Sequence, residues 1–191
     1  MFAQCLDPIA VKMSIYRFRV NLQHEDEDIF RDVDIKLTDT LLELHYGIQE
    51  AFEFDNTQMA SFYLSNDDWE KGAELTLFDM NEPGAEDIQM MHEAVLTQAL
   101  GGVGDKLVYV FDFMNLWTFH VELIQDLEAS EKVSYPAVVN FVGTAPNQYS
   151  RATVMQNEEE HLLAASKETD QQSDDVPLQD DIFEGFDDFN Q

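Results

Sequence analysis

Alternating apolar and polar positions mark two strands near the start of the chain. The segment 15–22 places Arg17 and Arg19 between apolar neighbours, and the segment 29–37 repeats the alternation. A period of two residues is typical of a β-strand with one buried face. The polar loop 24–28 is short enough to connect antiparallel neighbours. We therefore expect an antiparallel hairpin.

A helix is predicted directly after this hairpin. Thr40 and Glu43 match a capping box, in which the Thr hydroxyl and the Glu carboxylate each satisfy a free backbone donor of the first turn. Apolar side chains then follow at helical spacing at Leu41, Leu44, Ile48, Ala51 and Phe52, and His45 lies on the same stripe. A single apolar stripe predicts a helix that packs one face on the sheet.

Further elements follow in the order strand, strand, helix, strand, strand. The strands are expected at 59–65, 74–78, 106–113 and 116–125, the helix at 88–100, and an added edge strand at 135–141. Gly101 and Gly102 suit the end of that second helix. The order ββαββαββ predicts an α+β fold, a mainly antiparallel sheet with two helices packed on it.

The composition changes near residue 156. Residues 156–191 hold twelve acidic side chains and one basic residue, Lys167, which predicts a largely disordered acidic tail. Near its end Phe183, Phe186 and Phe189 interleave with carboxylates, as in short docking motifs, although a merely solubilising tail fits the same pattern. We expect a single domain over 13–155 and a frayed N-terminal extension over 1–12.

The charge of the chain restricts its partners. Its 39 acidic and 10 basic residues give a net charge of −29, and 27 acidic and nine basic residues remain when the tail is removed. This charge disfavours direct binding to nucleic acid, which rests on Lys and Arg contacts to phosphate. It can attract a basic partner, imitate a nucleic-acid backbone, or simply keep the protein soluble.

The sequence predicts a cytoplasmic protein. No apolar run approaches the ~20 residues that a membrane helix needs. The first residues lack the features of a secretory signal, and the single cysteine, Cys5, fits a reducing compartment. No membrane association and no cofactor are expected.

The best candidates for chemistry are Asp112 and His120, because a carboxylate and an imidazole in one aromatic hairpin could bind a metal or transfer protons. If 114–115 form a two-residue turn, Asp112 lies opposite Trp117 and His120 opposite Tyr109, so the two point to different faces. One extra loop residue reverses this. The structural alternative is a hydrogen-bonded Asp at the turn and a partly buried His.

His45 is a further candidate metal ligand. A lone histidine on an apolar helical stripe is also consistent with a satisfied core residue. The chain contains no complete catalytic or metal-binding signature, and no nucleophile can be nominated.

Several segments resemble the Ri-plasmid ORF-three-like family. The stretch 109–120 is similar to the family's Tyr-x-Tyr-Asp-Phe-Gly-Asp-x-Trp-x-His, and 29–31 stands where the family has an Ile-Trp-Arg. The resemblance covers roughly 15–146 and implies an α+β fold and an association with plasmids and insertion elements, but no activity. Met114 and Asn115 replace the family's Gly-Asp, so a ligand site that uses the second Asp is not expected here.

Three functions fit the sequence. The leading hypothesis is a non-enzymatic protein-interaction module, because the chain is acidic and lacks a catalytic constellation. The second is a small enzyme or metal-dependent hydrolase that uses Asp112 and His120. The third is an acidic nucleic-acid mimic that binds a basic DNA-binding protein.

Overall fold

A computed structural model describes residues 14–24, 27–79 and 89–151 of the 191-residue chain. The chain divides into two units, Met1–Gln148 and Tyr149–Gln191, and every strand and helix named here lies in the first. The elements are β1 (Ser14–Leu22), β2 (Ile29–Lys36), α1 (Leu41–Ala51), β3 (Ala60–Ser65), β4 (Lys71–Thr76), β5 (Gln89–Met90), α2 (Leu96–Ala99), β6 (Lys106–Phe111), β7 (Trp117–Glu128) and β8 (Ala137–Val142). The predicted extension 1–12 and the predicted tail 156–191, with Phe183, Phe186 and Phe189, lie outside the described residues.

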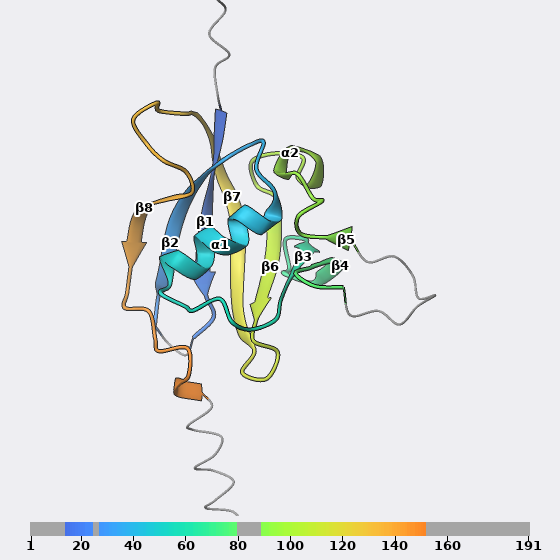
Figure 1. The fold of residues 1–191 in the computed structure, drawn as a ribbon, viewed down its shortest axis with the longest axis vertical. Coiled ribbons are helices and arrows are strands. Elements are labelled where there is room, and N and C mark those ends of the chain that lie inside the picture. Colours follow the sequence, from blue (N-terminus) through green and yellow to red (C-terminus); the bar gives the residue numbers. More distant parts are fainter. Residues whose placement is uncertain (1–13, 25–26, 80–88, 152–191) are drawn as a thin grey trace, which may run out of the picture. The chain divides into compact units, whose positions relative to one another are not determined.

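All eight strands belong to one sheet, in the order β5-β4-β3-β6-β7-β1-β2-β8 (Figure 1). Six of the seven neighbouring pairs are antiparallel, whereas β4 and β5 run parallel. A sheet with two helices agrees with the predicted α+β class, but the sheet is mixed rather than strictly antiparallel. The parallel pair arises because the chain returns to the sheet after β4 in the same direction. β5 and β8 form the two edges.

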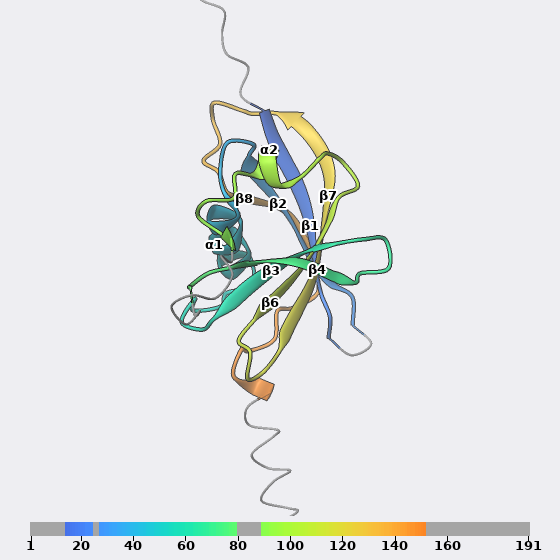
Figure 2. The same ribbon diagram turned by 90° about the vertical axis from the view of Figure 1, so that its right-hand side faces the viewer.

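Helix α1 begins with the predicted capping box. The Thr40 hydroxyl accepts a hydrogen bond of 3.2 Å from the Leu42 amide, and the Glu43 carboxylate accepts one of 2.8 Å from the Thr40 amide. The helix lies along one face of the sheet (Figure 2). Its buried side chains include the predicted Leu41, Leu44 and Ile48. Among the described residues, no helix combines the length and the apolar character that a membrane crossing requires.

The core between α1 and the sheet is rich in aromatic rings. Its largest fully buried side chains are Trp117, Tyr109, Phe18, Phe52, Phe62, Phe111 and Phe119. Phe52, just after α1, meets Phe119 of β7 edge to face, with ring centroids 4.9 Å apart. Trp117 also donates a hydrogen bond of 2.9 Å from Nε1 to the carbonyl oxygen of Gln148, which satisfies its buried polar atom.

The predicted helix over 88–100 is wrong for most of its length. Gln89 and Met90 form β5 against β4, and Val95 is extended, so α2 covers only Leu96–Ala99. The apolar side chains of this segment have no consistent 3.6-residue period, so backbone pairing with β4 determines its conformation. The fourth strand also begins at Lys71, earlier than the predicted residue 74.

The pairing register of β6 and β7 is shifted by one residue from the register expected for a two-residue turn at 114–115. Phe111 pairs with Trp117 and Val108 pairs with His120, so five residues, 112–116, form the connection. Asp112 and Leu116 both have positive φ values, 56° and 52°. The longer turn therefore takes Asp112 out of the strand.

Candidate functional site

Asp112 stabilises the turn between β6 and β7. Its Oδ1 accepts hydrogen bonds from the backbone amides of Met114 (3.1 Å) and Asn115 (3.2 Å), and its Oδ2 accepts one of 2.6 Å from Nδ2 of Asn115. Aspartate tolerates the left-handed conformation better than most residues. Both carboxylate oxygens bond within the turn, which fits the structural interpretation of Asp112.

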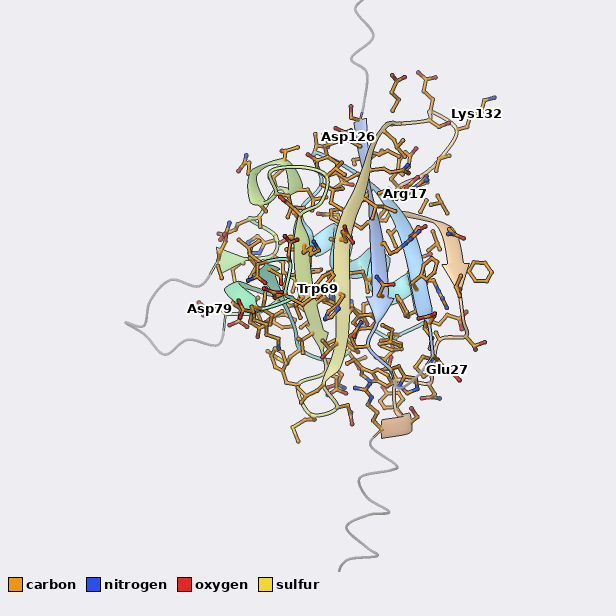
Figure 3. The ribbon with its side chains drawn as sticks, turned by 180° about the vertical axis from the view of Figure 1, so that it is seen from behind. Arg17, Glu27, Trp69, Asp79, Asp126 and Lys132 are labelled. Atoms are coloured by element: carbon orange, nitrogen blue, oxygen red, sulfur yellow. The ribbon has the colours of Figure 1, made fainter. Side chains whose placement is uncertain are left out.

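His120 points away from α1. Trp117, Phe119 and Val121 of the same strand lie in the core, and successive side chains of a strand alternate between its faces. The His120 ring stacks on Trp69, with centroids 4.0 Å apart and planes at 4°. Figure 3 shows Trp69 on this outer face of the sheet. Burial lowers the pKa of His120 below its usual value.

His45 belongs to α1 and lies on the inner side of the sheet, in a buried hydrogen-bond network between the helix and β6. The Asn56 Oδ1 atom can only accept, so His45 Nε2 donates to it (2.5 Å) and Nδ1 accepts from the Tyr109 hydroxyl (2.7 Å). Gln49 Nε2 donates a bond of 2.8 Å to the same hydroxyl. Burial lowers the pKa of His45 to about 4, although the bond to Asn56 acts in the opposite direction.

The three candidates therefore do not share a site. Asp112 lies in the turn between β6 and β7, His45 lies in α1 and faces the inner side of the sheet, and His120 lies on the outer face of β7. Within 14–24, 27–79 and 89–151, no group of three or more His, Cys, Asp or Glu side chains is arranged to hold a metal ion.

The outer edge of the sheet at β8 has different properties. Four of the twelve large apolar side chains that are exposed among the described residues belong to this strand: Val138, Val139, Phe141 and Val142. Phe141 is 69% exposed. Residues 133–150 contain no Asp, Glu, Lys or Arg, although 26% of the chain is charged. β8 is thus an apolar, uncharged edge on a highly charged protein.

The two edges of the sheet differ in length. β5 has two residues, whereas β8 has six and pairs with β2 on one side only. Proteins usually shield an edge strand with charged residues, proline, a bulge or a covering element, because its free amides and carbonyls can pair with another chain. β8 has one bulge, at the register shift opposite 32–33, and Asn140–Val142 pair regularly with β2 beyond it.

A groove runs between α1 and β8. One pocket of about 350 Å³ is lined by Arg31, Ala51, Glu53, Val138, Phe141, Gly143, Thr144 and Ala145. A smaller pocket of about 190 Å³ is lined by Val33, Gly47, Glu50, Pro136, Ala137 and Val138. The two pockets adjoin at Val138. Because Gly47 has no side chain, Pro136 approaches the helix closely; a Cβ atom there would lie 3.0 Å from the Cβ of Pro136.

Arg31 of β2 lies at one end of this groove. Its side chain is buried between the rings of Phe52 and Phe141, 5.0 and 5.6 Å from the guanidinium carbon. Nε donates to the carbonyl oxygen of Ala51 (3.1 Å), and Nη1 donates to those of Phe30 and Val142 (both 2.8 Å). Burial lowers the pKa of Arg31 from its usual value, and the charge of Glu53 partly opposes this shift.

Sequence reasoning did not identify Arg31 or the apolar edge as functional residues. Arg31 stands in the predicted second strand, where its alternation gives no sign of a pocket. The uncharged run 133–150 is visible in the sequence and could have indicated an unprotected edge. The sequence did predict an edge strand at 135–141, but its pairing with β2, which brings it beside Arg31, is not determined by the pattern alone.

Comparisons with known proteins agree with the fold. Residues 14–182 match the model of the plasmid pRiA4b ORF-3-like protein family, a longer match than the predicted 15–146. No curated protein matches the chain. The crystal structure of a protein of unknown function from Methanosarcina mazei Go1 is similar, with 18% identity, a TM-score of 0.60, and coverage of 80% of this chain and 83% of that one. At this identity the likeness shows the fold alone.

Proposed function

This chain belongs to the plasmid pRiA4b ORF-3-like protein family, and we propose that it is a non-enzymatic protein-interaction module. In this proposal an extended segment of a basic partner protein pairs with the free edge of β8. The observation that carries the proposal is the exposed, uncharged, apolar strand Ala137–Val142 in a chain with a net charge of −29.

The backbone of β8 supplies the first part of the binding energy. Backbone amides and carbonyls on the side away from β2 face no strand of the described sheet, and an added strand satisfies them by main-chain hydrogen bonds. A second exposed apolar group, Phe113, Met114 and Leu116, lies at the tip of the β6–β7 turn. That turn is not a β-strand and cannot pair with an extended segment along its length, so β8 is the better site for strand addition.

The side chains of β8 supply specificity. Phe141 pairs with Arg31 and Val138 with Val33, so both lie on the α1 face beside the groove. Val142 pairs with Phe30 on the other face. Alternate side chains of a bound segment would therefore meet apolar contacts on both faces, as in other complexes formed by strand addition.

Charge selects the class of partner. A second copy of this chain would bring another −29 and be repelled, whereas a positively charged protein is attracted at long range. The uncharged strand itself neither attracts nor repels. A basic protein with an apolar, β-prone segment thus fits both the long-range field and the local surface.

Selection of random displayed peptides against the full chain tests this proposal. We expect enriched peptides to combine apolar β-formers with Lys or Arg, and to lose binding to Val139→Lys. Val103→Lys is the matched control, because it makes the same charge change at an exposed valine in the loop before β6. Absence of enrichment, or equal binding to both variants, would contradict the proposal. A dimer that Val139→Lys dissociates would assign the edge to a second copy instead.

A further inference from the structure

Arg31 differs from the other arginines of the sheet in forming no ion pair with any residue that the structure describes. On the neighbouring strand β1, Arg17 binds both carboxylate oxygens of Asp34 (2.6 and 2.8 Å), and Arg19 binds both of Asp32 (2.8 and 2.9 Å). No Asp or Glu among the described residues lies within salt-bridge distance of Arg31, although it is only 7% exposed. Within the part of the chain that the structure describes, this buried cation therefore has no direct ion-pair partner, although the charge of Glu53 acts on it from a longer distance.

The unused donors of this cation belong to Nη2. The Nε and Nη1 atoms are occupied by three backbone carbonyls, whereas Nη2 has no hydrogen-bond partner among the described residues. Arg31 lines the pocket of about 350 Å³, and the exposed Thr144 lines the same pocket. The pocket therefore offers guanidinium N–H groups and a side-chain hydroxyl beside the ring of Phe141.

We propose that this pocket binds a carboxylate group. A carboxylate would accept from Arg31 Nη2 and from the Thr144 hydroxyl, and it would neutralise the buried charge. Hydrogen bonds between charged groups are roughly twice as strong as neutral ones, and more so where water is excluded. The proposal concerns the pocket alone and does not depend on strand addition at β8.

The surroundings favour a single negative charge over a phosphate dianion. Glu53 lines the pocket and would repel an incoming anion, and the net charge of −29 adds to this effect at long range. A carboxylate carried by a neutral or cationic molecule meets the least opposition. A peptide C-terminus and a small organic acid are the two sources of this chemistry.

NMR titration of the full chain tests the proposal through the Nε–H signal of Arg31, which the bond to Ala51 shields from solvent. The probes are a short Val- and Lys-containing peptide with a free C-terminus, the same peptide amidated, and sodium acetate, all at constant ionic strength. We expect saturable shifts with the free acid and at least ~10-fold weaker binding of the amide. Tighter binding of the peptide than of acetate assigns the site to a peptide terminus, and the reverse assigns it to a small acid.

Three variants check that the carboxylate occupies this pocket. Glu53→Gln removes the repulsion and should tighten binding by about threefold, whereas Glu93→Gln removes an exposed charge elsewhere and should leave it unchanged. Thr144→Val should weaken binding several-fold without disturbing the core. The inference is overturned if no probe gives a saturable shift, if the amide binds as well as the acid, or if Glu53→Gln behaves like Glu93→Gln.

Discussion

The Nη1 atom of Arg31 donates a hydrogen bond of 2.8 Å to the carbonyl oxygen of Val142, the last residue of β8. The same guanidinium reaches the carbonyl oxygen of Ala51, the last residue of α1. One buried cation therefore joins the edge strand, the end of the helix and the pocket between them. The integrity of the proposed binding surface depends on this side chain.

Replacing Arg31 should destabilise the fold. Arg31→Met keeps much of the apolar contact with Phe52 but leaves three backbone carbonyls without their donor. We expect a loss of about 2–4 kcal/mol in the free energy of unfolding. Urea denaturation measures it. Lys132→Met, which removes a positive charge from an exposed turn, should change stability by less than about 0.5 kcal/mol. Equal losses in both variants would show that the hydrogen bonds of Arg31 contribute little.

His45 should make the protein less stable in acid. Burial lowers its pKa in the folded protein from 6.5 to about 4, so the unfolded chain takes up the proton first as the pH falls. The contribution of neutral His45 to the free energy of unfolding is complete above about pH 6.5. It decreases progressively towards pH 4, and the total loss is at most about 3 kcal/mol.

The measurement for His45 is urea unfolding across this pH range. His45→Gln should reduce the slope of stability against pH between 4 and 6.5, whereas His92→Gln, at an exposed turn, should keep it. His120 also has a lowered pKa and contributes in the same direction, so the comparison is between variants rather than with a flat line. An unchanged slope in His45→Gln would contradict the assignment of a neutral, buried His45.

Asp112 should matter for stability through the turn. Asp112→Ala removes three hydrogen bonds within 112–115 and should cost about 1–2 kcal/mol. Asp112→Asn retains an acceptor for the Met114 amide and should cost less than half as much. Met114→Ala, in the same turn but 82% exposed, should be nearly neutral. Thermal unfolding of the three variants measures the order of their stability losses. A large loss in Met114→Ala would contradict the role given to the Asp112 hydrogen bonds.

The sequence predicted those elements that a local pattern determines. The alternation at 15–22 and 29–37 and the capping box at Thr40 correspond to β1, β2 and the start of α1. The prediction of a second helix over 88–100 was wrong for most of that range. Residues 89–90 pair with β4, and this pairing outweighs a weak helical periodicity. The register of the β6–β7 hairpin depends on the Asp112 turn, whose hydrogen bonds involve side chains that the pattern does not describe.

The candidate site was less accessible to prediction than the fold. Asp112 and His120 are close in sequence, but the five-residue turn and the alternation of β7 separate them. Arg31 and Phe141 are far apart in sequence and meet only because β8 pairs with β2. The edge position of β8 agrees with the edge strand predicted at 135–141, but the identity of its neighbour, β2, follows from the sheet order and not from the six residues of β8.

Amide hydrogen exchange on the full chain tests the central claim most directly. The experiment compares the free protein with its complex with a basic peptide selected by display. Strand addition predicts slower exchange of the β8 amides that face away from β2, within Ala137–Val142, and loss of this protection in Val139→Lys but not in Val103→Lys. Protection confined to other regions, such as the β6–β7 turn, with β8 unchanged, would contradict the proposed interaction edge.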